Sequence, residues 1–230
     1  MKTIGLLGGM SWESTVTYYK AINQRVRERK GGLHSAQCLM FSFDFAPIEK
    51  LQRDGNWKEA GRLLGNAANQ LKAAGAEGIV LCTNTMHVVS EDIENASQLP
   101  FLHIVDPTAK RIVEAGFKTV GLLGTRFTME KEFYISRLAA KYGLSVIVPD
   151  EEGRTIVHDI IYKELCNGII REASRDAYHK VIADLAKNGA ECLILGCTEI
   201  GLLINEKDCQ LPVFDTTTIH AIAAADWAME

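Results

Sequence analysis

The chain has 230 residues, 47% of them hydrophobic and 23% charged, with a formal net charge of -4 at pH 7. This composition is typical of a globular protein that buries a sizeable core, and the negative charge gives no electrostatic case for nucleic acid or an anionic membrane as a partner. No apolar run approaches the roughly 18–20 residues of a membrane span, and the N-terminus lacks the apolar region and cleavage site of a secretory signal. We therefore expect a cytoplasmic protein.

Short apolar runs, several of them ended by glycine, predict buried parallel strands. In chain order they cover residues 3–7, 79–81, 101–104, 119–123, 144–148, 193–195 and 213–214, with 38–43 as a further candidate. Helical patterns lie between them. The first is an apolar stripe after Ser11, a typical N-cap residue, and it consists of Trp12, Val16, Tyr19, Ile22 and Val26. Further stripes lie within residues 63–74, 156–165 and 181–186. This alternation predicts an α/β fold with mostly parallel sheets.

The sequence contains six cysteines, which are Cys38, Cys82, Cys166, Cys192, Cys197 and Cys209. None forms a Cys-x-x-Cys pair, and no group of Cys and His has the spacing of a zinc site. Disulfides are not expected in a reducing cytosol, and free cysteines usually behave as small core residues. We expect no metal site, and a reactive thiol must be identified by its position.

An internal repeat is the most informative feature of the sequence. Three segments recur in the same order at offsets of 116, 114 and 112 residues: 4–9 at 120–125, 75–81 at 189–195, and 99–101 at 211–213. A common turn sequence explains any one of these matches easily, but it does not easily explain three matches in register. We therefore predict two similar α/β halves with a boundary near residues 105–116. Ligands of open parallel sheets bind at the carboxyl ends of strands, so the repeated loops are expected to line one shared cleft.

The same register pairs Cys197 with Thr83, each just past a buried strand. The segment LGCTE at 195–199 resembles the second active-site motif of aspartate/glutamate racemases. NTMH at 84–87 is similar to the Cys-Asn-Thr-x-His first motif of that family, and IGLLGGM at 4–10 to its N-terminal signature. The resemblance extends over the whole chain. It implies two Rossmann-like or flavodoxin-like halves related by a pseudo-twofold, residues 1–105 plus 216–230 and residues 106–215, with the active site in the cleft between them.

The resemblance also implies the chemistry, which is α-proton exchange on an amino acid without pyridoxal phosphate or any other cofactor. One thiolate removes the α-proton, and a second thiol returns a proton to the opposite face. By resemblance, Cys197 serves the L-enantiomer. Neighbouring N–H donors or a helix N-terminus are expected to lower the pKa of this thiol.

Thr83 stands where the family has its first catalytic cysteine. Cys82 is adjacent, but consecutive residues past a strand point in different directions, and a shift of register would break both the Asn-Thr-x-His match and the repeat. We therefore expect Thr83 in the site. Since an alcohol is a far weaker acid than a thiol, Thr83 or a water that it holds should return the proton slowly.

Substrate-binding residues follow from the same resemblance. Asn84, Thr85, Thr125 and Thr198, with loop N–H groups near Met10, are expected to hold the α-carboxylate and its developing charge. Thr128 and Glu199 complete this set, and Glu199 replaces a His that is usual in glutamate racemases, which favours the aspartate-type branch.

The group that binds the distal part of the substrate is less clearly indicated. Segment 45–53 is expected to form a loop over the cleft, from which Gln52 or Arg53 contacts the distal carboxylate. A family Lys at this site aligns with Cys166, and Lys163 is a nearby alternative, although Arg53 and Lys163 also fit solvated surface charges. His87 fits either a base or, more simply, a structural residue.

Aspartate or glutamate is the expected substrate, and a homodimer is expected by resemblance. Several alternatives share the architecture. A broader or neutral amino-acid specificity remains open without a clear basic pair. A single-cysteine decarboxylase of the arylmalonate type, a maleate isomerase and a hydantoin racemase also fit the fold, as does a binding protein that has lost catalysis with its first cysteine.

Overall fold

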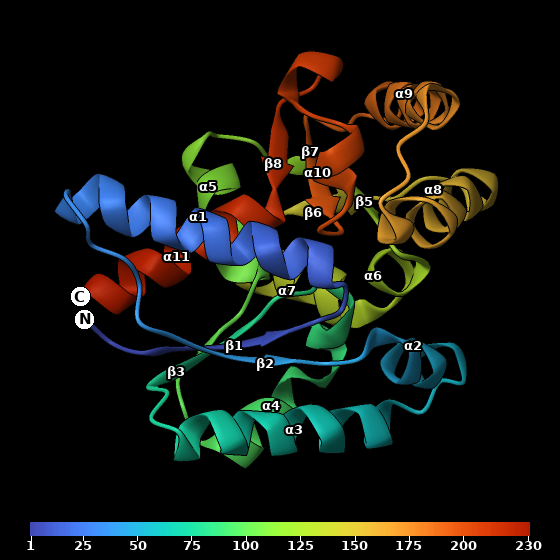
Figure 1. The fold of residues 1–230 in the computed structure, drawn as a ribbon. Helices are drawn as coiled ribbons and strands as arrows, with labels where there is room; N and C mark the ends of the chain where they lie inside the picture. The colour runs from blue at the N-terminus through green and yellow to red at the C-terminus, as the bar shows by residue number, and fades with distance from the viewer. The chain divides into compact units, whose positions relative to one another are not determined.

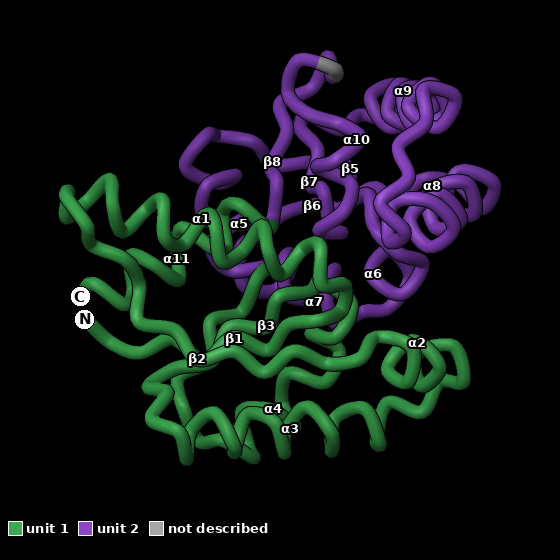
Figure 2. The backbone as a smooth tube through the Cα atoms, viewed as in Figure 1, with its two compact units in different colours: residues 1–104, 217–230 green, residues 105–216 purple. Residues whose placement is uncertain are grey.

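A computed structural model describes residues 1–230, apart from the side chain of residue 208. The chain divides into two compact units (Figure 2). Unit 1 comprises residues 1–104 and 217–230, and unit 2 comprises residues 105–216. Within the described residues, each unit contains a four-stranded sheet in which all paired strands are parallel. No helix among the described residues is both long and apolar enough to cross a bilayer.

Unit 1 is a sheet in the order β2-β1-β3-β4 with helices on both faces. Its elements are β1 (Ile4–Gly8), α1 (Trp12–Lys30), β2 (Cys38–Ser42), α2 (Phe45–Arg53), α3 (Trp57–Ala73), β3 (Gly78–Leu81), the 3-10 helix η1 (Thr85–Val89), α4 (Ser90–Ser97), β4 (Phe101–Leu102) and α11 (Thr216–Met229), the last joined at its first residue to unit 2. Helices α3 and α4 cover one face of the sheet, and α1 and α11 cover the other (Figure 1).

Unit 2 repeats this arrangement with the sheet order β6-β5-β7-β8. Its elements are α5 (Val105–Glu114), β5 (Thr119–Gly124), α6 (Arg126–Glu130), α7 (Glu132–Tyr142), β6 (Ser145–Ile147), α8 (Glu151–Lys163), η2 (Leu165–Asn167), α9 (Glu172–Lys187), β7 (Cys192–Gly196), α10 (Ile200–Leu203), η3 (Glu206–Asp208) and β8 (Val213–Asp215). Helices α8 and α9 contribute to one core cluster with β7, while α5 and α7 pack together and against β8 and β6. The predicted α/β fold with two similar halves is confirmed, and each predicted strand lies within two residues of its expected bounds.

Two local predictions were wrong. Segment 45–53 is not a loop but helix α2, because Asp44 caps it by accepting a hydrogen bond from the Ala46 N–H, and Pro47 lies in the first turn, where proline is tolerated. In α1, Trp12, Val16 and Tyr19 are exposed, Trp12 by 64%. The buried residues are Ser14, Thr15, Tyr18, Ile22 and Val26. The apolar stripe had combined parts of two faces of the helix.

Candidate functional site

In unit 1, two neighbouring parallel strands end side by side and deliver two of the predicted loops. Strands β1 and β3 pair through Leu7 and Leu81, and the Cys82 N–H donates to the Leu7 carbonyl at 2.9 Å. The chain then turns at Gly9, with φ +84°, and Met10 is buried before α1 begins. A Cβ at Gly9 would collide with the Phe43 backbone, so this close approach requires glycine.

The loop after β3 carries Thr83, Asn84 and Thr85, all of them buried. Their predecessor Cys82 is fully buried in the apolar cluster that also contains Leu6 and Val80, and this burial raises the pKa of the Cys82 thiol far above its ordinary value. The structure therefore places the Cys82 thiol, next to the loop, in the hydrophobic core. Thr83 follows it at the start of the polar segment.

His87 in η1 is joined to the backbone through both ring nitrogens. Its Nδ1 lies 2.7 Å from the Thr83 carbonyl oxygen, and the Ile104 N–H donates to its Nε2 at 3.1 Å. A carbonyl can only accept and an amide N–H can only donate, so the ring is the neutral tautomer with its proton on Nδ1. Of the two interpretations of His87, this geometry supports the structural one and leaves the ring without a lone pair for general-base chemistry.

Unit 2 places its two predicted loops in the same way. Gly124 of β5 is paired with Gly196 of β7, and Thr125 and Cys197 are the next residues along each strand. A Cβ at Gly124 would lie 2.8 Å from the Gly196 carbonyl oxygen, so the two strand ends approach closely. Thr125 caps α6: its Oγ1 accepts from the Thr128 N–H at 3.3 Å and lies 3.3 Å from the Thr128 hydroxyl.

Cys197 lies in a compact acidic cluster. Its thiol donates to Glu199 Oε2 at 2.9 Å, and the Thr198 hydroxyl donates to the same oxygen at 2.6 Å. All three residues are buried. Burial first, and then the Glu199 carboxylate, raise the pKa of the Cys197 thiol well above its ordinary value. The lowered pKa that the sequence led us to expect is therefore wrong: the Glu199 backbone N–H does lower the pKa of the thiol, but burial and the Glu199 carboxylate outweigh it.

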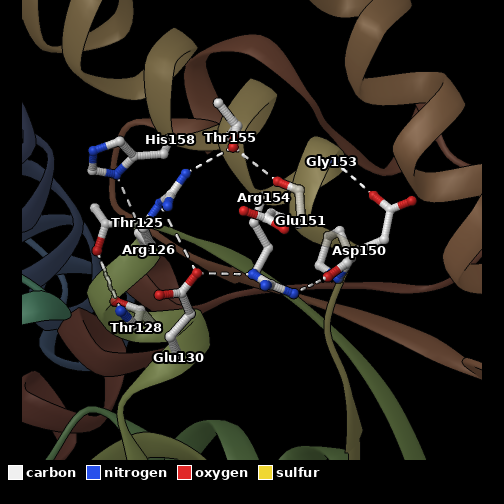
Figure 3. A network of polar contacts seen from close by, with 11 residues as sticks. Thr125, Arg126, Thr128, Glu130, Asp150, Glu151, Gly153, Arg154, Thr155 and His158 are labelled. Carbon is white, nitrogen blue, oxygen red and sulfur yellow. Dashed lines mark hydrogen bonds and ion pairs between the residues drawn. The ribbon is translucent and has the colours of Figure 1, made fainter.

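A polar network holds α6, with its N-cap Thr125, against α8 (Figure 3). The Arg126 N–H donates to His158 Nδ1 at 3.2 Å, and Arg126 Nη2 donates to the Thr155 hydroxyl at 2.7 Å. Burial, together with the Arg126 guanidinium, holds the pKa of His158 below its usual value. The short helix α6 is thus fixed to α8 by charged and neutral hydrogen bonds that no sequence pattern indicated.

The candidates for the distal group lie in different environments. Gln52 is buried on α2, and its Nε2 donates to the Met86 sulfur at 3.0 Å. Arg53 and Lys163 have side chains that are 64% and 71% exposed, and each is paired with a carboxylate one turn earlier on its own helix, Glu49 and Asp159. The two cations are therefore engaged in surface ion pairs, whereas Gln52 is held beside the residues that follow Thr83.

Two threonines that stabilise these loops were missed. Thr15 Oγ1 accepts from the Gly9 N–H at 2.8 Å, and the Thr216 hydroxyl donates to the Leu195 carbonyl at 2.7 Å, two residues before Cys197. Thr216 could have been recognised by its position directly after β8, the strand that pairs with β7. Among the described residues, no group of three or more His, Cys, Asp or Glu side chains is placed to hold a metal ion.

Comparison with known proteins gives consistent results over the full chain. Residues 7–224 match the family model described as Asp/Glu/Hydantoin racemase. The broad-specificity amino-acid racemase RacX of Bacillus subtilis is 23% identical over 226 residues, covering 95% of this chain and 94% of that protein. A Yersinia pestis structure solved as a candidate Asp/Glu racemase is 57% identical, with a TM-score of 0.93 and full coverage of both chains. An aspartate racemase homologue from Pyrococcus horikoshii OT3 is 35% identical, with a TM-score of 0.85 and full coverage of both.

Proposed function

This chain belongs to the Asp/Glu/Hydantoin racemase family of isomerases, and we propose that it racemises aspartate or glutamate without a cofactor, with Cys197 removing the α-proton of the L-enantiomer. The observation that carries the proposal is the buried thiol of Cys197 on the carboxylate of Glu199, 2.9 Å away, just past a central strand. The internal repeat supplies its counterpart, because Thr83 occupies the equivalent position in unit 1.

The first step requires a thiolate, and the resting thiol is protonated. The Cys197 proton passes to Glu199 Oε2, which leaves Cys197 as the anion and Glu199 as the acid. The thiolate then takes the α-proton of the substrate, and the electron pair of the C–H bond moves into the α-carboxylate as a planar enediolate. Thr198, which donates to the same oxygen at 2.6 Å, keeps Glu199 oriented toward the sulfur throughout this exchange.

Inversion requires a proton from the opposite face. Thr83, or a water held by its hydroxyl, supplies it in our proposal, and the weak acidity of an alcohol makes this step slow compared with removal of the proton by Cys197. Because the equilibrium constant between enantiomers is unity, kcat/KM must be equal for L- and D-substrate. The asymmetry should therefore appear in kcat and KM separately, and in the ratio of α-proton exchange to inversion.

Several buried polar groups support binding of the α-carboxylate. We assign this binding to Asn84, Thr85, Thr125 and Thr198 with the loop at Met10, and Thr128 orients Thr125. Hydrogen bonds to the carboxylate strengthen as negative charge accumulates on it, so the same groups stabilise the enediolate.

Broad amino-acid specificity is the second candidate, and one observation favours it. Gln52 presents a neutral amide, with a thioether as its hydrogen-bond acceptor, while Arg53 and Lys163 are held in surface ion pairs. A thioether is a weak acceptor, so a better one on a substrate would displace it at small cost. A neutral amide also discriminates less between carboxylate and amide side chains than a cation does. The similarity to a broad-specificity racemase is consistent with this candidate.

The test is α-proton exchange in deuterated water, followed by NMR, on L-Asp, L-Glu and a series of neutral L-amino acids. We expect exchange with Asp or Glu, and a loss of about 100-fold or more in Cys197→Ser. Cys209→Ser, which removes a thiol of the same unit outside the site loops, is the matched control and should retain the parent rate.

Each outcome separates the candidates. Comparable exchange of neutral amino acids would support broad specificity, and exchange that survives Cys197→Ser would contradict the assigned base. An enzyme that exchanges no amino acid would redirect the search to a single-thiol decarboxylase or a binding protein. The homodimer expected from the resemblance stays a prediction, which light scattering on the purified chain would check.

A further inference from the structure

The imidazole of His87 connects two points of unit 1 that are far apart in sequence. It receives a hydrogen bond from the N–H of Ile104, the last residue of unit 1 before the chain passes into unit 2, and it donates to the carbonyl of Thr83. The side chain is only 1% exposed. The loop that carries the proposed proton donor is therefore attached to the point where the chain leaves the unit.

The ring has little freedom to change this arrangement. Its centroid lies 5.4 Å from that of Phe101, 4.6 Å from that of His103 and 6.0 Å from that of His220. Packing at these separations restricts the ring to one orientation, and the two backbone partners determine which nitrogen carries the proton. Because the His87 Nδ1–H is held rigidly, it also determines the direction in which the Thr83 carbonyl points. Since the carbonyl and the side chain share one Cα, it constrains the direction of the Thr83 hydroxyl.

Unit 2 has no such ring at the equivalent position. The register that pairs Thr83 with Cys197 pairs His87 with Gly201, which has no side chain. There the strand end before Cys197 is held instead by the hydroxyl of Thr216, which donates to the Leu195 carbonyl at 2.7 Å. The imidazole is thus present only in the half that carries the weaker acid, whose proton transfer depends most on a short and well-aligned hydrogen bond.

We propose that His87 is a positioning residue for Thr83: its Nδ1–H holds the Thr83 carbonyl so that the adjacent hydroxyl is aimed for proton return. This inference rests on the proposed racemase function. A substitution of His87 should therefore change the rate of proton removal and the rate of inversion differently, whereas a general structural effect would lower both. Proton removal at Cys197 belongs to unit 2 and should be little affected by His87, whereas inversion depends on Thr83 and should be affected strongly.

Two substitutions each keep one of the two hydrogen bonds of the His87 ring and remove the other. The Nδ2 of His87→Asn occupies the place of Nδ1 and can still donate to the Thr83 carbonyl, but the variant loses the acceptor for Ile104. The Oε1 of His87→Gln occupies the place of Nε2 and can still accept from the Ile104 N–H, but the variant loses the donor to Thr83. We expect the ratio of inversion to α-proton exchange of L-substrate to fall on the order of tenfold or more in His87→Gln. In His87→Asn we expect it to stay within about threefold of the parent.

Ser97 provides the control. It is also buried in unit 1, on α4, where its Oγ donates to the Ile93 carbonyl at 2.9 Å. The variant Ser97→Ala should lower the midpoint of urea unfolding as the His87 variants do, and it should leave the ratio of inversion to exchange unchanged.

The outcomes distinguish this inference from the function on which it rests. An unchanged ratio in His87→Gln, an equal fall in both His87 variants, or an equal fall in Ser97→Ala would each overturn the positioning role while exchange in the parent upholds the racemase. A parent enzyme that exchanges no amino acid would overturn the proposed function, and the positioning role with it.

Discussion

At the scale of single residues, the environment of Cys197 decides how the proposed chemistry can begin. The thiol is buried and shares the Oε2 atom of Glu199 with the Thr198 hydroxyl. Because burial and the nearby carboxylate both disfavour the thiolate, the sulfur is protonated and in contact with the carboxylate that we propose as its proton acceptor. In the proposed mechanism the base is thus formed by a local proton transfer and not by a permanently ionised cysteine.

Glu199→Gln should have opposite effects on thiol reactivity and on turnover. Removing the carboxylate removes a cause that raises the pKa of Cys197, so the pH profile of alkylation by iodoacetamide should move to lower pH, while burial keeps the pKa above its ordinary value. Exchange of the substrate α-proton should fall by about 100-fold, because the acceptor of the thiol proton is lost. If alkylation and α-proton exchange both rise or both fall in Glu199→Gln, the assigned role of Glu199 is contradicted. Glu206→Gln, at an exposed residue, serves as the control.

Thr83→Cys should place a stronger acid than the alcohol in the first half. A thiol with an ordinary pKa of about 8.5 donates far more readily than an alcohol, so the ratio of inversion to α-proton exchange should rise by about tenfold or more. The measurement is NMR in deuterated water combined with chiral chromatography of the product. Thr83→Ser, which keeps a hydroxyl, should resemble the parent, and an unchanged ratio in Thr83→Cys would exclude position 83 as the proton donor.

At the scale of elements, both halves place their polar loops at the carboxyl ends of two adjacent central strands. In unit 2 the paired Gly124 and Gly196 precede Thr125 and Cys197, and in unit 1 the pair Leu7 and Leu81 precedes the loops at Gly9 and Thr83. Parallel pairing makes these strand ends adjacent, so residues more than 70 positions apart come to the same edge of a sheet.

Gly9→Ala should destabilise the protein by more than about 1 kcal/mol, because the native φ is positive and the added Cβ would meet the Phe43 backbone. Gly32→Ala is the matched control, since Gly32 also has a positive φ, +56°, but no atom lies within 4 Å of the added Cβ. Urea unfolding of both variants measures the difference. Equal losses would show that the conformation alone, and not the close approach to Phe43, requires the glycine.

At the scale of the whole molecule, the C-terminal helix completes the first half. Four alanines of α11, at positions 221, 224, 225 and 228, are fully buried in the cluster formed with Tyr18, Ile22 and Val26. Trp227 packs on Gly78, where a Cβ would collide with the indole ring. The unit that begins the chain therefore completes one of its helical layers, which α1 begins, only when the end of the chain returns to it.

A chain truncated after residue 216 should lose the cooperative unfolding of unit 1. The deletion exposes the apolar face of α1 and of the sheet, and lost burial on this scale costs several kcal/mol. Circular dichroism during urea unfolding should show a second, lower transition or a loss of helical signal beyond that of the deleted residues. Removal of Glu230 alone is the control, and a single transition at the parent midpoint in the truncated chain would contradict the prediction.

The sequence by itself determined the alternation of strands and helices, the repeat, and the equivalence of Cys197 and Thr83. These features are local or periodic, so they can be recognised along the chain. It could not determine that Trp12 is exposed or that His87 connects Thr83 to Ile104, because each depends on what packs beside it in the folded unit. Helix α2 was missed although its cap at Asp44 is a local signal. The pKa of Cys197 is the clearest case. Burial and a carboxylate two residues away raise it, and only the tertiary structure decides that the side chain of Glu199 turns back toward the sulfur.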